Sequence, residues 1–525
     1  MQTVQIVILL LSAVAALALL APRLKTPYPI LLVLGGLIIC FIPGLPEPRL
    51  NPDIALLIFL PPLLFAQSWI TPWRDLQRYR RPIAMLAVGL VLFTTVAVGY
   101  VTHWLMGLPL AAGFALGAII SPPDAVAASA IAERLGLPRR IVTILEGESL
   151  VNDATGLVAY KFAIAAMLTG SFSLVEATGQ FFVVVTGGVA LGLGVAWVAG
   201  RALARIHENP VVITLTLLVP YAVYVAAEHL HVSGVLGVVA AGQYLGWRAP
   251  VIMSASTRLQ AGAFWDILVF LLNSIIFLLI GLQLPFIWSN LSGYSSFQLI
   301  TYGAAILGVV ILVRPLWVFP GAYLPRLLSR RVRETEPPPG WRNVLVLGWS
   351  GMRGVVSLAA ALAVPLTTAD GSPFPGRDLI LFLTFAVILG TLVGQGLTLA
   401  PLIRWLGVHG DSLDEKQSIQ ARVALAEAAQ LRLAELAQEQ SLPEVAITSV
   451  RATYDERLAH LTDEQAHVLG WSQRREELVA SRRLRRECLR AELHKLIELR
   501  ERGDLPAHLY YELQHELDLE EEKLR

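Results

Sequence analysis

Long apolar runs separated by short polar loops fill the first 405 residues of this 525-residue chain. A helix of about 20 residues crosses the hydrocarbon core of a bilayer. Thirteen runs fit such spans, near residues 3–21, 27–46, 53–70, 83–106, 108–131, 141–168, 177–203, 210–229, 233–247, 261–288, 298–322, 343–366 and 378–403. The pattern therefore predicts an all-α polytopic membrane protein with about 13 transmembrane helices. The first run lacks the basic flank of a signal peptide, so we interpret it as a span.

Basic residues in the loops predict the orientation. If the N-terminus is outside, nineteen Lys and Arg side chains fall in cytosolic loops, whereas only Arg49 and Arg377 fall in external loops. Positively charged loops stay preferentially on the cytosolic side of a membrane. We therefore expect a multi-pass protein of the cell membrane, surrounded by lipid, with an external N-terminus and a cytosolic C-terminus.

Charge divides the chain near Gly410. Residues 1–410 hold 24 Lys and Arg and 16 Asp and Glu, whereas residues 411–525 hold 17 and 24. We predict a transmembrane domain over residues 1–409 and a cytosolic helical tail over residues 410–525. Apolar residues in the tail recur at three- and four-residue spacing, which is typical of amphipathic helices. A solvated helical bundle and a regulatory or oligomerising domain both fit this pattern.

The same composition excludes several classes of function. An acidic, amphipathic tail argues against nucleic-acid binding. The two cysteines, Cys40 and Cys488, lie in different regions, which excludes a disulfide framework and a cysteine-rich metal site. We expect no resident cofactor and no enzyme activity.

Ionisable residues within the predicted spans are candidate functional groups, because placing a charge there costs at least a few kcal/mol. The acids are Asp124, Glu146, Glu148, Asp153, Glu228 and Asp266, and the bases are Lys161, Arg314 and Arg353. Several of these lie near span ends. Asp124, Asp153 and Arg353 lie deepest.

Three acids fall within the stretch "EGESLVNDATG", residues 146–156. Ser149 and Asp153 are four residues apart and therefore share one helix face. Their hydroxyl and carboxylate oxygens suit a hard monovalent cation. Glu148 and Asn152 share the adjoining face, where they can bind a partner such as a guanidinium group.

Two other spans carry signals for an interrupted helix. In "AIISPPDAVAA", Pro122 and Pro123 remove backbone donors and break the helix beside Asp124. Broken helices at membrane depth are tolerated when they are buried in protein or line a cavity, and many transporters build ion sites from them. A proline kink with a structural aspartate is the alternative.

The second signal is the glycine-rich stretch "GWSGMRGVVSLAAALAVP", residues 348–365, which contains Arg353. An unpaired arginine at this depth would be costly. Glu148 is the partner that we expect for Arg353. Pairing with another acid, or stabilisation of a chain break by Arg353 alone, remains open.

These segments resemble the cation:proton antiporter superfamily, specifically its sodium/proton exchanger branch. The resemblance covers about residues 5–405. It is carried by "FLPPLLFAQSW" (59–69), "AIISPPDAVAASAI" (118–131), "ILEGESLVNDATGLVAYKFA" (144–163), "VSGVLGVVAAG" (232–242), "FWDILVFLLNSIIFLLIGLQL" (264–284) and "GWSGMRGVVSLAAALAVP" (348–365). It implies two inverted repeats, crossed broken helices in a core domain, and a second domain that forms a homodimer.

The resemblance also implies roles for individual residues. The cation and proton site maps onto Asp153, with Asp124, Ser149 and backbone groups around Pro123. The Asn152–Asp153 pair goes with electroneutral exchange in this family. A structural ion pair maps onto Glu148 and Arg353, with Asn152 between them.

Two departures from the family pattern bear on ion selectivity. The usual threonine of the first broken helix is replaced by Pro123. Ala66 and Gln67 follow "LPPLLF", where some members have an acid. Na⁺, K⁺ and Li⁺ therefore all remain open as the transported cation.

A mechanism follows from desolvation. A carboxylate in a partly dehydrated site holds a proton more tightly, whereas a bare cation stabilises the ionised form. Proton and cation then compete for Asp153 and Asp124, and exchange serves pH and cation homeostasis. A cation channel, an intramembrane aspartyl enzyme using Asp124 and Asp153, and a non-transporting sensor are the alternatives.

Overall fold

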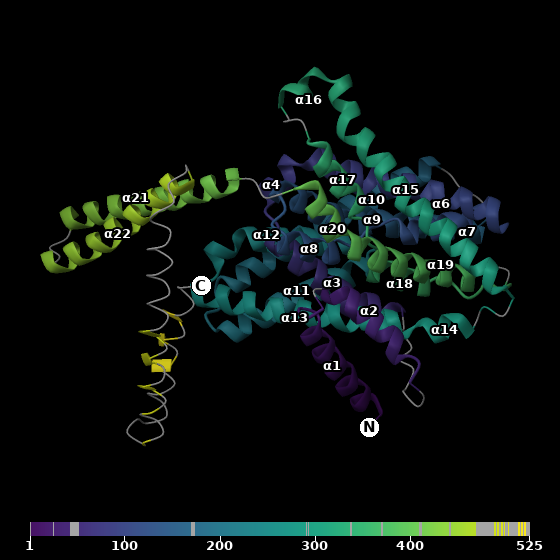
Figure 1. The fold of residues 1–525 in the computed structure, drawn as a ribbon, viewed down its shortest axis with the longest axis horizontal. Helices are drawn as coiled ribbons and strands as arrows, with labels where there is room; N and C mark the ends of the chain where they lie inside the picture. The colour runs from purple at the N-terminus through teal and green to yellow at the C-terminus, as the bar shows by residue number, and fades with distance from the viewer. Residues whose placement is uncertain are drawn as a thin grey trace. The chain divides into compact units, whose positions relative to one another are not determined.

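The computed structural model describes residues 2–24, 26–42, 52–169, 174–289, 291, 293–335, 339–368, 371–408, 412–439 and 443–468, with short stretches between 488 and 520. Within these residues the chain is helical, without β-strands (Figure 1). The predicted all-α class is confirmed. The chain divides into two compact units, residues 1–409 and 410–525.

The helices of the first unit are α1 (Gln2–Leu20), α2 (Tyr28–Ile39), α3 (Pro52–Ile70), α4 (Trp73–Arg78), α5 (Arg80–Ala84), α6 (Val91–Met106), α7 (Leu110–Ile120), α8 (Ala125–Arg134), α9 (Arg139–Thr169), α10 (Leu174–Leu203), α11 (Asn209–His229), α12 (Gly234–Ile252), α13 (Ala255–Leu282), α14 (Leu284–Ser289), α15 (Ser296–Leu328), α16 (Arg330–Thr335), α17 (Trp341–Trp349), α18 (Val355–Leu362), α19 (Arg377–Leu389) and α20 (Gly396–Leu406). Two π-helical turns, η1 (Met85–Leu90) and η2 (Gly390–Gln395), join α5 to α6 and α19 to α20. The second unit contains α21 (Ser412–Glu439) and α22 (Glu444–Val468), which pack on each other. The rest of the predicted helical tail, from residue 469 on, lies largely outside the described residues.

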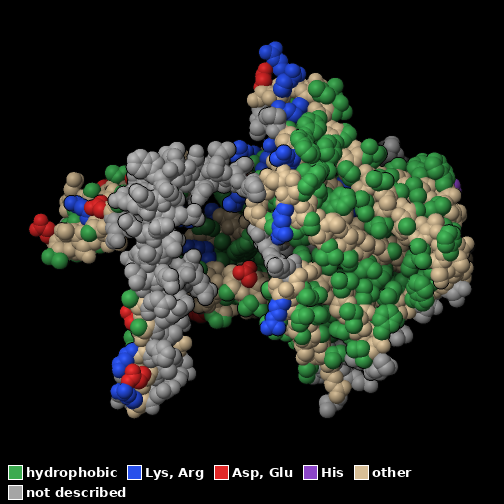
Figure 2. Space-filling model, viewed as in Figure 1, with side chains coloured by type: hydrophobic (Ala, Val, Ile, Leu, Met, Phe, Trp, Pro, Cys, Tyr) green, Lys and Arg blue, Asp and Glu red, His purple; other side chains and the backbone are tan. Residues whose placement is uncertain are grey.

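Six of the described helical segments are long and apolar enough to cross a membrane. They are Arg80–Met106, Thr178–Leu203, Asn209–His229, Ala255–Leu282, Ser296–Leu328 and Arg377–Leu406. Figure 2 shows apolar side chains over much of the surface, and Phe297, Ile300, Leu312 and Leu316 are exposed on α15. An apolar surface of this extent suits hydrocarbon. The count of thirteen spans and the inverted repeats stay predictions.

Two helices are interrupted where the sequence predicts. Helix α7 ends at Ile120, and α8 begins at Ala125, after the two prolines that lack backbone donors. Helix α17 ends at Trp349, and α18 begins at Val355. The two breaks contact each other: the Asp124 amide donates to the Met352 carbonyl over 2.7 Å. The predicted breaks are therefore confirmed, and they lie together.

Helices α2 and α13 pack closely because glycine lies on both sides of their contact. A Cβ atom on Gly36 would lie 3.0 Å from the Cα atom of Gly281, and a Cβ atom on Gly281 would lie 2.7 Å from the Leu37 nitrogen. Small residues at such crossings let helix backbones approach in membranes. This contact fixes α13, which lines the cavity described below.

We expect Gly281→Val to destabilise the fold, because its side chain would push α2 and α13 apart. Overpacking of this kind costs about 1–3 kcal/mol. Thermal unfolding of the purified protein in detergent measures the effect. Gly262→Val, on the same helix with nothing within 4 Å of the added Cβ atom, is the control. Equal unfolding temperatures for the two variants would contradict this packing.

Candidate functional site

Helix α9 presents the predicted polar residues on two faces, as their spacing requires. Ser149 and Asp153 are buried and line one cavity. Glu148 and Asn152 are also buried but turn toward other elements. The Asn152 side chain donates from Nδ2 to the Pro123 carbonyl over 2.7 Å. One face of α9 therefore meets the cavity, and the other holds neighbouring segments in place.

The first break is fixed by hydrogen bonds around Asp124. The carboxylate oxygen Oδ1 accepts from the Val126 amide over 2.9 Å, at the start of α8. The Ser149 hydroxyl accepts from the Ala125 amide over 3.5 Å. These bonds satisfy backbone donors that the first turn of a helix leaves free. They also bring Asp124 and Ser149 together, as predicted.

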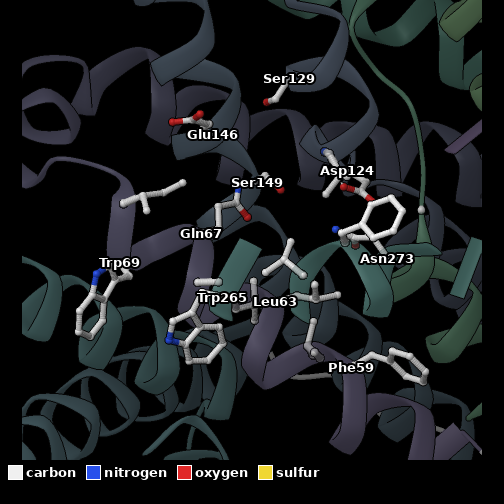
Figure 3. A pocket seen from close by; sticks show the side chains of 18 of the residues that line it. Phe59, Leu63, Gln67, Trp69, Asp124, Ser129, Glu146, Ser149, Trp265 and Asn273 are labelled. Carbon is white, nitrogen blue, oxygen red and sulfur yellow. Dashed lines mark hydrogen bonds between the residues drawn. The ribbon is translucent and has the colours of Figure 1, made fainter. Parts of the chain in front are cut away.

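Residues of both helix breaks and of α9 line one cavity of about 540 Å³ (Figure 3). Asp124, Ser149, Asp153 and Pro122 line it, together with apolar side chains of α3 and α13. Two carboxylates and a hydroxyl thus share one space. Such a set of oxygens can coordinate a monovalent cation, and its carboxylates can hold protons.

The ion pair of Glu148 corrects one prediction. Glu148 pairs with Arg314 of α15, with Nη1–Oε1 and Nη2–Oε2 distances of 2.6 and 2.8 Å. Both side chains are 1% exposed. Arg353, the expected partner, forms no salt bridge with a described residue. The two-pronged geometry explains why Arg314 binds this carboxylate so well.

Arg353 instead stabilises the chain breaks. Its Nε atom donates to the Ile120 carbonyl at the end of α7 over 2.9 Å. Its Nη1 atom donates to the Gly351 carbonyl. Its own amide donates to the Thr391 hydroxyl over 3.1 Å. Of the alternatives left open by the sequence, stabilisation of a chain break is the one observed.

The remaining intramembrane candidates are less central. Glu146 is half-buried and Asp266 is exposed, and both line the same cavity. Glu228 and Lys161 form an exposed pair with an N–O distance of 3.9 Å. Lys161 is therefore not a buried base, contrary to its position within a predicted span.

Further uncharged polar residues that we did not predict as site residues also line the cavity, among them Tyr28, Gln67, Ser129, Asn273 and Ser357. They are uncharged at neutral pH, so a search for ionisable residues passes over them. A search for any polar side chain within an apolar run finds Asn273 in "LVFLLNSIIFLL". Hydroxyl and amide groups are common enough in membrane helices that this signal alone is weak.

Comparison with known proteins matches residues 8–405 to the family described as "Sodium/hydrogen exchanger, transmembrane". A sodium, potassium, lithium and rubidium/H⁺ antiporter of Bacillus pumilus is 35% identical over 508 residues, covering 94% of this chain and 74% of that protein. An uncharacterized Na⁺/H⁺ exchanger of Mycobacterium tuberculosis is 34% identical over 526 residues, covering 99% and 96%. The solved sodium proton antiporter of Methanocaldococcus jannaschii has a similar fold, with a TM-score of 0.60 at 24% identity, covering 77% of this chain and 99% of that one.

We expect Arg314→Met to destabilise the protein strongly, because it leaves Glu148 buried without its partner. Loss of one member of a buried pair costs about 3–5 kcal/mol. Thermal unfolding in detergent measures this cost, with Arg330→Met in the exposed Arg330–Glu334 pair as control. A double-mutant cycle should couple Glu148→Gln more strongly to Arg314→Met than to Arg353→Met. The reverse order would contradict the observed pairing.

Proposed function

The chain belongs to the sodium/hydrogen exchanger family, and from this premise we propose that it exchanges Na⁺ for H⁺ at Asp153 and Asp124. The family and its antiporter relatives support cation/proton antiport. The observation that carries the proposal is the cavity in which Asp124, Ser149 and Asp153 meet at the two helix breaks.

Exchange follows from competition for the same oxygens. A carboxylate removed from water is stabilised either by a proton or by a bound cation. Each ligand neutralises the site and lowers the cost of moving it through apolar surroundings, whereas the empty, charged site moves poorly. Coupling of the two fluxes needs no other energy source.

We infer an electroneutral exchange of one cation for one proton, with Asp153 as the titrating group. The Asp124 carboxylate already accepts a hydrogen bond from the start of α8. The dipole of that helix balances part of the negative charge of Asp124. Glu148 is paired with Arg314 and therefore takes no part in the exchange. Asn152, next to Asp153, is neutral and bound to the Pro123 carbonyl.

The identity of the cation is a further part of the proposal. The site offers carboxylate and hydroxyl oxygens but lacks the threonine hydroxyl that is usual in this family. The Bacillus pumilus relative is named for sodium, potassium, lithium and rubidium. We propose Na⁺ as the main substrate, with K⁺ and Li⁺ as further substrates. We also propose that the chain acts as a homodimer in the cell membrane, in pH and cation homeostasis.

The cavity supports an inward-facing state. Its lining includes Ile70 at the end of α3, Glu146 near the start of α9 and Arg258 near the start of α13, and it also reaches Leu56 near the start of α3. Charge in the loops predicts that the first three lie toward the cytosolic side and Leu56 toward the external side. Because both charged residues among these four lie toward the cytosol, we propose that the cation site opens to the cytosol in this conformation.

We expect Asp153→Asn to abolish exchange, because the amide neither binds a proton nor balances a cation. Proton flux into sealed vesicles, followed with an interior pH dye after addition of Na⁺, K⁺ or Li⁺, measures this. Asp266→Asn, which removes an exposed carboxylate of the cavity wall, is the control and should keep exchange. Cation-coupled flux in Asp153→Asn would contradict the proposal, and a wild type without flux would favour the sensor.

The same assay tests the competition through pH. A proton bound at Asp153 excludes the cation, so the KM for the cation should rise as pH falls. Where the protonated form dominates, the rise should approach about tenfold per pH unit. The maximal rate at saturating cation should change much less. A KM that does not depend on pH would rule out a shared site.

We expect Gln67→Cys, in a chain with Cys40 and Cys488 replaced by Ala, to react with a membrane-impermeant thiol reagent from the cytosolic side. Gln67 is half-buried and lines the cavity. Labelling of vesicles of known orientation measures this, with exposed Ser254→Cys as a reactive control. Faster labelling of Gln67→Cys from the external face would contradict an inward-facing cavity.

A further inference from the structure

Asn273 of α13 presents a polar side chain to the cavity. The residue is 3% exposed, and its side chain forms no hydrogen bond with any described residue. Its amide atoms are not among the fully enclosed polar atoms that lack a partner, so the amide is open to the cavity. A polar group held this far from bulk water needs a hydrogen-bond partner or a bound ion, and only water or a cation in the cavity can supply it here.

Asn273 lies on the part of the cavity wall that also carries Tyr28 and Phe270. The Tyr28 and Phe270 rings lie 5.5 Å apart, and Tyr28 also lines the cavity. Phe270 and Asn273 are three residues apart on α13, so they share a helix face. In Figure 3, Asn273 lies on the same side of the cavity as Asp124.

A second neutral oxygen faces the same space. Ser357 of α18 is 2% exposed, lines the cavity and forms no hydrogen bond through its side chain with any described residue. It lies three residues after Gly354, where an added Cβ atom would overlap the Asp124 carboxylate. Helix α18 therefore brings this hydroxyl close to the first break.

We propose that the amide oxygen of Asn273 coordinates the transported cation, with the Ser357 hydroxyl as a further ligand, and that Asn273 sets cation preference. The proposal rests on the proposed antiport and names ligands from α13 and α18 for its cation. Carbonyl oxygens replace the water shell of a monovalent cation, and their number and field strength decide which ion is favoured. Asn273 supplies such an oxygen without adding a charge to compete for protons.

The test uses Asn273→Leu, which keeps a similar volume and removes the oxygen. Stabilisation of the purified, detergent-solubilised protein by Na⁺, Li⁺ and K⁺ at alkaline pH reports binding, and KM values in vesicles report transport. We expect about tenfold weaker binding, equal to the loss of about 1.4 kcal/mol. The loss should differ among the three cations, so that their order of preference changes.

A matched control lies next to Asn273. Ser274 is fully buried on the same helix but does not line the cavity. Ser274→Ala should leave cation affinity and preference unchanged. Asn273→Ser, which keeps a shorter oxygen donor, should retain part of the affinity and replaces Asn273→Leu if that variant does not fold.

The outcomes separate this inference from the antiport. If Asn273→Leu lowers only the unfolding temperature without cation, and binds every cation as the wild type does, Asn273 is structural and the inference is overturned while antiport stands. If Asn273→Leu weakens binding but the wild type exchanges no protons, the inference stands and antiport fails. A wild type that no cation stabilises overturns both.

Discussion

The contact between the two helix breaks is the constraint on which the rest of the site depends. Backbone groups at membrane depth must find partners within the protein, because hydrocarbon offers none. Here each break supplies partners to the other: Asp124 donates its amide to Met352, and Arg353 donates to the carbonyl of Ile120. With the backbone satisfied in this way, the carboxylate of Asp124 is free to face the cavity.

The two buried arginines have different partners. Arg314 binds Glu148 in a two-pronged pair, while Arg353 binds carbonyl groups of the breaks. Among the described residues, Asp124 and Asp153 form no salt bridge. Their charge is thus left for a mobile ligand, as the proposed exchange requires. An arginine paired with either aspartate would supply a fixed counter-charge and compete with both proton and cation.

The sequence predicted the parts of this site that depend on local chemistry. Pro122 and Pro123 lack the backbone donors of a continuous helix, and a four-residue spacing places Ser149 and Asp153 on one face. A proline pair alone does not decide a break, because Pro61 and Pro62 lie within α3. The partner of Glu148 depends on how α15 packs against α9, because Arg314 is 166 residues away in the sequence. The sequence therefore suggested Arg353 as the partner, which was wrong. Asn273 and Ser357 were missed because neutral polar residues are common in membrane spans. Their position on the cavity wall singles them out.

At each break a side-chain hydroxyl accepts a hydrogen bond from a backbone amide, but the residue one helical turn beyond that hydroxyl differs in charge. Ser149 accepts from the amide of Ala125 at the start of α8, and Thr391 accepts from the amide of Arg353 just before α18. Four residues beyond these hydroxyls stand Asp153 and Gln395 respectively. This parallel supports the predicted inverted repeats. It also agrees with the proposed assignment of exchange to the first break, because a glutamine does not titrate and therefore cannot trade a proton for a cation as an aspartate can.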